Sequence, residues 1–269
     1  GMTPQDFVAY VRGLAEECNY PFEKIILGGD HLGPSVWQNE PTESAMEKSE
    51  ELILQYVQAG FTKIHLDCSM KLGDDPEGVL DVEVIAQRAA RLVRVAEQSL
   101  PSPRGRGAGG ELRYIIGTEV PVPGGATEHE EGVSVTNVED VKQTIDVTRE
   151  AFSREGLESA WERVVGVVVQ PGVEFGDDFV LPYRPEAAKE LSKGASSLKM
   201  PGLGSITLHG GAAGLSSAGI QMYVGDQDAE WEHYLPGVVT AVGVVTLSSV
   251  TINRLLQNRE GRSEEHTSE

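Results

Sequence analysis

The sequence predicts an α/β fold built on a parallel sheet. Short runs of Val, Ile and Leu alternate with longer segments of helical periodicity, and no tight hairpin signal separates the runs. Such an alternation is typical of parallel strands joined by helical crossovers and buried on both faces. A length of 269 residues suits one large α/β domain or two small ones.

The elements follow from local signals along the chain. Thr3 and Pro4 suit the N-cap and first position of a helix, and an apolar stripe runs from there to residue 15. Thr42 suits the N-cap of a second helix, which Gly60 ends. The remaining predicted elements are strands 24–29, 61–67, 112–117, 163–170, 205–209 and 238–247, and helices 42–59, 82–98, 138–155 and 185–192.

Both a doubly wound sheet and a TIM (β/α)₈ barrel fit this order, and the strand ends favour the barrel. Five strands end in polar residues, namely Asp30–His31, His65 and Asp67, Glu119, Gln170 and His209. A barrel gathers the C-terminal ends of all its strands around one site, whereas an open sheet binds ligands at one switch point. About six strands are present, so we expect an incomplete barrel.

Charge and hydropathy exclude some classes of binding partner. The formal net charge of -20 repels phosphate backbones, so we expect no nucleic-acid partner, although a local pocket can still bind a phosphorylated small molecule. No apolar run reaches 18 residues and no secretion signal opens the chain, which predicts a cytoplasmic protein without a membrane partner. Cys18 and Cys68 are expected to be reduced, buried thiols.

The segment 28–34, Gly-Gly-Asp-His-Leu-Gly-Pro, is the sharpest motif. An imidazole at His31 can bind a metal while the carboxylate of Asp30 moves a proton or orients water. The alternative is a polar strand end with a structural Asp. One strand further, Asp67 and Ser69 are candidates to face a substrate, and the alternative there is a satisfied interior His65 with Asp67 as a cap.

Later strand ends repeat the pattern. Glu119 can act as a metal ligand or general base, Gln170 can bind a sugar hydroxyl, and His209 can bind a metal. The alternative for Glu119 is a surface residue in a tight loop. Candidate backbone donors to a phosphate follow two of these strands, at Gly124, Gly125, Gly210 and Gly211. No Gly-x-x-x-x-Gly-Lys-Ser/Thr is present.

Four motifs, at 25–34, 59–69, 116–125 and 168–175, resemble the Z subunit of class II D-tagatose-1,6-bisphosphate aldolase. The resemblance covers residues 1–203. It implies a TIM barrel of the class II aldolase type and a cytosolic role in tagatose, galactitol or N-acetylgalactosamine breakdown. It further implies a non-catalytic subunit that supports a separate catalytic subunit. Related members resemble metal-dependent epimerases that interconvert fructose 6-phosphate and tagatose 6-phosphate at C4.

The resemblance also implies a site. We expect a ketose phosphate substrate and zinc or another divalent metal, held by His31 and His209 with Glu119 as a third ligand. Asp30 or Asp67 would move the proton. The expected partner is a catalytic class II aldolase subunit or a second copy of the chain.

The ends of the chain carry expectations of their own. Members of the family begin with two further strands and continue past position 269, so the chain is expected to be a fragment. We expect one partial barrel domain over residues 1–261, of which 204–261 depart from the family pattern as a divergent branch or an assembly error. Residues 262–269 are expected to be a non-native tail.

Overall fold

The computed structural model describes most of the first 169 residues and scattered segments beyond them. The described ranges are 2–100, 111–117, 135–169 and 189–191, together with the backbone of five short strands, β5 (Glu174–Phe175), β6 (Val180–Leu181), β7 (Thr207–Leu208), β8 (Met222–Tyr223) and β9 (Val244–Ser248).

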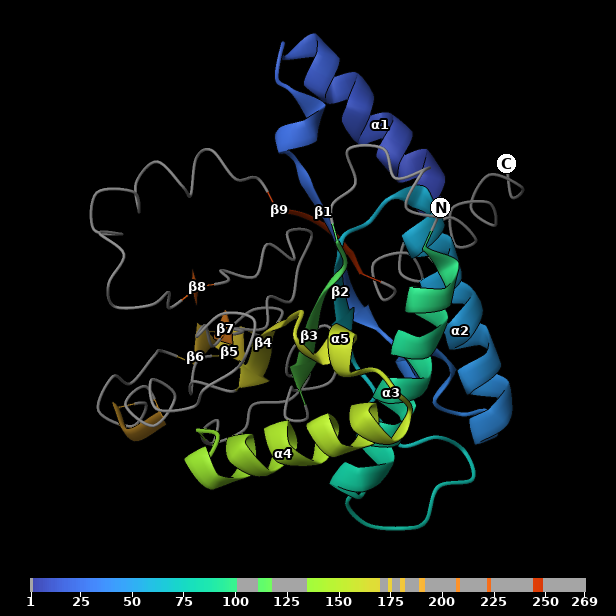
Figure 1. The fold of residues 1–269 in the computed structure, drawn as a ribbon, viewed down its shortest axis with the longest axis vertical. Coiled ribbons are helices and arrows are strands. Elements are labelled where there is room, and N and C mark those ends of the chain that lie inside the picture. The colour runs from blue at the N-terminus through green and yellow to red at the C-terminus, as the bar shows by residue number, and fades with distance from the viewer. Residues whose placement is uncertain are drawn as a thin grey trace, which may run out of the picture.

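Strands and helices alternate through the first part of the chain (Figure 1). The helices are α1 (Pro4–Glu17), α2 (Thr42–Ala59), α3 (Val82–Ser99), α4 (Val138–Arg154) and the short α5 (Glu158–Trp161). The main strands are β1 (Ile26–Leu32), β2 (Lys63–Leu66), β3 (Arg113–Gly117) and β4 (Val164–Val169). Two 3₁₀ turns, η1 (Phe22–Lys24) and η2 (Pro34–Trp37), flank β1. The prediction of an α/β fold with a parallel sheet is therefore confirmed.

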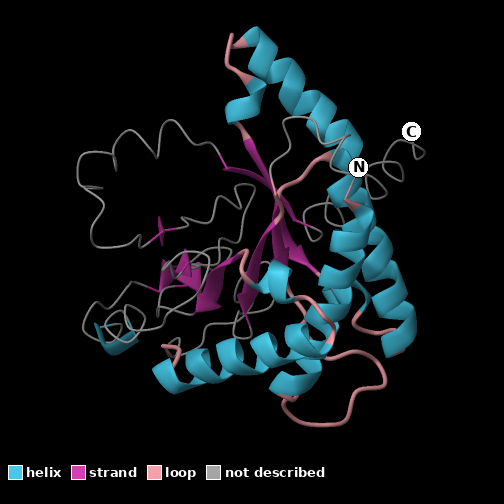
Figure 2. Cartoon of the chain, in the orientation of Figure 1, coloured by secondary structure: helices cyan, strands magenta, loops and turns pink. Residues whose placement is uncertain are grey.

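Within the described part of the chain, the main sheet has seven strands in the order β8-β7-β4-β3-β2-β1-β9. All its neighbours are parallel except β7 and β8, which pair antiparallel. β5 and β6 form a separate antiparallel pair, which is not among the elements predicted from the sequence. In Figure 2 the strands fan out with a marked twist, and α2 and α3 lie together on one side of them.

Strands β1 to β4 follow one another without reversal, and each helix from α1 to α4 packs against the next. A doubly wound sheet reverses direction at a switch point, whereas a barrel winds steadily in one direction. β9, the last of the described strands, lies beside β1 and parallel to it. Within the described strands β8 and β9 remain the two ends of the order, so the closed barrel stays a prediction.

Helix starts show one confirmed cap and one correction. Thr3 caps α1 in a reciprocal capping box with Asp6, as predicted. Thr42 is not a cap, because Pro41 holds that position without a side-chain hydrogen bond. The amide and hydroxyl of Thr42 instead donate to Asp74 Oδ1, at 2.7 and 2.5 Å, so a residue 32 positions away stabilises the start of α2.

The two faces of β2 have opposite character. Ile64 and Leu66 belong to the main apolar core, which the helices complete. Lys63, His65 and Asp67 alternate with them and are also buried, at 5%, 1% and 1% exposure. The strand therefore presents apolar side chains to the helices and a row of ionisable groups to the opposite face of the sheet.

The other predicted elements fall partly outside the described residues. Within the predicted strand 205–209 the structure describes β7, and within the predicted strand 238–247 it describes the first residues of β9. Of the predicted helix 185–192 it describes residues 189–191, which are helical. Cys68 is buried as expected, whereas Cys18 is exposed because it ends α1. Among the helices described, none is long and apolar enough to cross a membrane.

Candidate functional site

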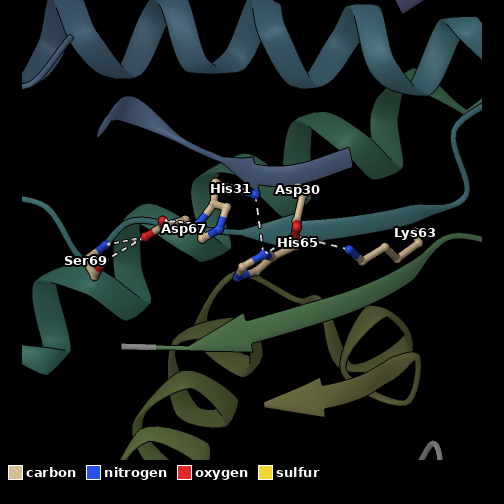
Figure 3. A network of polar contacts seen from close by, with 6 residues as sticks. All are labelled: Asp30, His31, Lys63, His65, Asp67 and Ser69. Atoms are coloured by element: carbon tan, nitrogen blue, oxygen red, sulfur yellow. Dashed lines mark hydrogen bonds and ion pairs between the residues drawn. The ribbon is translucent and has the colours of Figure 1, made fainter. Parts of the chain in front are cut away.

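The site begins with a bulge in β1. Gly29 pairs with Ile64, but the next pairing joins Leu32 to Leu66, so β1 contains one more residue than β2 over this interval. His31 has φ of 50°, in the left-handed region that few side chains adopt. Successive residues of a regular strand point to opposite faces, and a bulge re-aims them. The side chain of Asp30 therefore reaches His65 of β2, and that of His31 reaches Asp67, the residue directly after β2 (Figure 3).

Asp30 and His65 form the buried half of the site. His65 Nδ1 lies 2.6 Å from Asp30 Oδ1, and the ammonium of Lys63 donates to the same oxygen at 3.1 Å. The backbone amide of His31 directs its N–H at the same Nδ1 atom from 3.3 Å, a contact that needs a lone pair on Nδ1. The shorter contact with Asp30 needs a proton there, because an ionised carboxylate only accepts, and this shorter contact decides the tautomer. One carboxylate oxygen thus receives two donors from β2.

His31 and Asp67 form the second half. His31 Nδ1 lies 2.9 Å from Asp67 Oδ2, and the His31 side chain is 13% exposed. The other oxygen, Asp67 Oδ1, accepts from the hydroxyl and the amide of Ser69, at 2.7 and 3.3 Å. The imidazoles of His31 and His65 lie close together, with ring centroids 4.9 Å apart. Two carboxylate–imidazole pairs therefore stand side by side.

Electrostatics keep both carboxylates ionised. Burial by itself would raise the pKa of Asp30, but the ammonium of Lys63 and the hydrogen bond from His65 hold that pKa well below its usual value. Burial also acts to raise the pKa of Asp67. The hydrogen bond from His31 and the charge of His31 outweigh burial, so the pKa of Asp67 lies below its usual value. The protons in both carboxylate–imidazole contacts consequently belong to the Nδ1 atoms.

The two imidazoles differ. Burial lowers the pKa of His65 and outweighs the hydrogen bond to Asp30, so this ring is neutral near pH 7. Burial acts in the same direction on His31, but Asp67 and the charge of Asp30 outweigh it and raise its pKa. A neutral imidazole with its proton on Nδ1 carries its lone pair on Nε2, the atom that binds a metal or accepts a proton.

Gly33 fixes where the two strands end relative to each other. A Cβ atom on Gly33 would lie 1.8 Å from the carbonyl oxygen of Asp67, so only glycine fits. The amide of Asp67 also donates to the carbonyl of Leu32 at 3.0 Å. The backbones that carry His31 and Asp67 are therefore in direct contact.

Asp30, His31 and His65 together offer a donor set for a metal ion. One ligand atom from each lies within 4.8 Å of the others. Two imidazoles and a carboxylate suit zinc and other first-row divalent metals, and the carboxylates on the two Nδ1 atoms resemble the outer partners that orient metal-bound histidines. The residues present therefore fit such an ion.

The structure brings together four of the residues singled out from the sequence, namely Asp30, His31, Asp67 and Ser69. The other candidates lie outside the described residues: Glu119, Gly124, Gly125, Gln170, His209, Gly210 and Gly211. The proposed pairing of His31 with His209 and Glu119 is thus untested, whereas His65 lies beside His31.

Two residues of the site, Lys63 and His65, are not among the predicted catalytic, substrate-binding or metal-binding residues. The sequence predicts His65 only as a polar residue at a strand end or a satisfied interior histidine. Their signal is the alternation Lys-Ile-His-Leu-Asp at 63–67, along β2 and the residue that follows it, which places three ionisable residues on one face of buried, extended backbone. Lysine is almost never fully buried without a partner, so its position in this strand already indicated a carboxylate nearby.

Comparison with known proteins agrees with these motifs. Residues 1–200 match the profile of the family described as D-tagatose-1,6-bisphosphate aldolase subunit GatZ/KbaZ-like. Over 192 residues, the chain is 51% identical to a protein from Salmonella dublin and 50% identical to one from Salmonella gallinarum, both named D-tagatose-1,6-bisphosphate aldolase subunit GatZ. The match covers 71% of this chain and 44% of each relative, so the chain spans less than half of their length.

A solved structure supports the fold. It is described as a probable tagatose 6 phosphate kinase from Sinorhizobium meliloti 1021, and it superposes with a TM-score of 0.65 at 35% identity. The superposition covers 92% of this chain and 53% of the other. Because the family profile matches well over half of the sequence, the chain belongs to the GatZ/KbaZ-like family of D-tagatose-1,6-bisphosphate aldolase subunits.

Proposed function

We propose that this chain is part of a D-tagatose-1,6-bisphosphate aldolase subunit that supports the stability and activity of a separate catalytic subunit. The observation that carries this proposal is the 51% identity to a relative named as that subunit. The expected setting is cytoplasmic breakdown of tagatose, galactitol or N-acetylgalactosamine. The kinase named for the solved structure is not carried over, because relatives at the higher identities of 51% and 50% are named as aldolase subunits.

A second candidate is a metal-dependent epimerase that inverts C4 of fructose 6-phosphate or tagatose 6-phosphate. The observation that favours it is the pair of buried carboxylate–imidazole contacts, Asp30 with His65 and Asp67 with His31. A subunit that only supports a partner needs no such arrangement. Buried ion pairs contribute little to stability compared with apolar packing, so function is the better reason for these groups.

The site residues have separable tasks under this second candidate. His31 and His65 would hold a divalent metal such as zinc, with Asp30 as a further donor or as the group that orients His65. A bound metal would polarise the carbonyl or alkoxide of the ketose phosphate. Asp67 keeps the proton of His31 on Nδ1, so that Nε2 is the atom that can receive a proton from a bound sugar hydroxyl.

One experiment separates the two candidates. A protein of the relatives' full length is purified with and without added zinc, its zinc content is measured, and it is assayed alone on fructose 6-phosphate. About one zinc per chain with formation of tagatose 6-phosphate supports the epimerase. The His65→Gln variant should then lose both zinc and turnover, while Lys71→Met, on the half-exposed loop after β2, should keep both.

The other outcome is equally informative. Absence of zinc and of turnover, together with raised aldolase activity when the protein is mixed with the catalytic subunit, supports the first candidate and removes the epimerase. No turnover alone and no effect on the catalytic subunit would contradict both.

A further inference from the structure

Lys63 occupies a position where a lysine is costly. Its side chain is 6% exposed, on a strand whose neighbouring residues pack in the apolar core. Removal of an ammonium group from water costs several kcal/mol, and an apolar pair of similar size is often at least as stable as a buried ion pair. Stability by itself is therefore a weak reason for a lysine here.

The contacts of Lys63 converge on one atom of the site. Its Nζ donates to Asp30 Oδ1 at 3.1 Å, and the same oxygen accepts from His65 Nδ1 at 2.6 Å. In the sheet Lys63 pairs with Gly28, two residues before Asp30, so its side chain extends along β1 to reach the carboxylate. Figure 3 shows the ammonium on the side of Asp30 away from His31, Asp67 and Ser69.

We propose that Lys63 is a positioning residue, whose ammonium holds the Asp30 carboxylate in the orientation that receives the Nδ1–H of His65. The lone pair of His65 is thereby kept on Nε2, where it is available for the metal that His65 would hold in the proposed function. This inference rests on that proposed function. Lys63 is not one of the three residues that offer a metal donor set, and it acts through its contact with Asp30. The Asp30 carboxylate, held by two donors from β2, cannot rotate away from His65 without losing both of them.

The inference can be tested without any activity. Long-range ¹H–¹⁵N correlation spectra of the full chain report which ring nitrogen of each histidine carries the proton, and a His65→Gln variant identifies the signals of His65. In the parent chain His65 is expected as the single Nδ1–H tautomer. Lys63→Met keeps a side chain of similar length without the ammonium, so Asp30 loses a donor and His65 is expected to populate both tautomers.

Two matched variants complete the test. Lys63→Arg keeps a cation at the position and is expected to restore the parent tautomer. Lys71→Met removes a half-exposed lysine from the loop after β2, where its ammonium lies 3.8 Å from the exposed carboxylate of Glu77. It is expected to leave the His65 signals unchanged.

Each result decides the matter. An unchanged Nδ1–H tautomer in a folded Lys63→Met chain overturns the proposal. If Lys63→Met fails to fold, by circular dichroism and urea unfolding, Lys63→Gln takes its place with the same expected mixture of tautomers. If neither neutral variant folds, Lys63 is a structural requirement, and its assignment as a positioning residue falls. The zinc and turnover results do not enter this measurement, so failure here is distinguishable from failure of the proposed function.

Discussion

The guanidinium of Arg88 donates to both carboxylate oxygens of Asp75, at 2.6 and 3.0 Å, and both side chains are only 7% exposed. Arg88 also donates to the hydroxyl of Thr42 at 3.3 Å, while Asp75 Oδ2 accepts from the amide of Leu72 at 2.6 Å. This pair ties the loop after β2 to α3 and to the start of α2. That loop carries Ser69, so the pair supports one edge of the candidate site.

Loss of one partner of this pair should be costly. We expect Arg88→Met to lower the free energy of unfolding by about 3–5 kcal/mol, because it leaves the Asp75 carboxylate buried without its counter-charge. Urea denaturation measures the change. Arg149→Met is the matched control, since Arg149 pairs with Asp146 on an exposed face, at 54% and 44% exposure, and should cost less than about 1 kcal/mol. Equal losses in the two variants would contradict the assignment.

The same pair predicts a pH dependence of stability. Burial acts to raise the pKa of Asp75, but the hydrogen bond from Arg88 and the amide of Leu72 lower it below its usual value. A carboxyl group with a lowered pKa in the folded state contributes stability above its unfolded pKa of about 3.9, and this contribution is lost as the pH falls through the folded pKa. The stability gap between the parent chain and Asp75→Asn should therefore narrow in acid. Urea titrations at neutral and acidic pH test this, and a constant gap would refute it.

Gly33 should tolerate no side chain. The φ of Gly33 is 170°, which any residue adopts, so the contact of a Cβ atom with the Asp67 carbonyl oxygen at 1.8 Å is the only obstacle. We expect Gly33→Ala to destabilise the chain by at least the ~1–3 kcal/mol typical of overpacking. Gly13→Ala is the control, because nothing lies within 4 Å of its Cβ position in α1. It should stabilise the chain by about 0.5–1 kcal/mol in urea denaturation. A Gly33→Ala chain as stable as the parent would disprove the close approach.

The left-handed backbone conformation at position 31 should make a glycine variant more stable than an alanine variant. Left-handed φ costs a residue with a side chain about 1–2 kcal/mol, and glycine avoids this cost. His31→Gly and His31→Ala both lose the contact with Asp67, so we expect the glycine variant to be more stable by about 1 kcal/mol. Asn19, which follows the end of α1 with φ of 51°, is a second site for the same comparison. The Asn19→Gly variant should be more stable than Asn19→Ala. Equal stabilities at position 31 in thermal unfolding would exclude the bulge conformation.

Local signals account for most of the described elements. The start of α1 at Thr3 and the end of α2 at Gly60 follow from short-range hydrogen bonds and from the backbone freedom of glycine, which neighbouring residues decide. The prediction for Thr42 was wrong because its hydrogen-bond acceptor, Asp74, comes from a distant loop. Sequence spacing carries no information about such a contact.

The sequence by itself determined the alternation of strands and helices, the parallel sheet and the presence of acids and histidines at strand ends. Only the tertiary structure decided which of them meet. A regular strand would separate Asp30 from His31, and the bulge of β1 brings both to β2. The register of β2 against β1 then places Lys63 and His65 on one oxygen of Asp30. These pairings depend on the bulge and on the exact strand register, whereas the alternation of side chains fixes only which face of a strand each residue occupies.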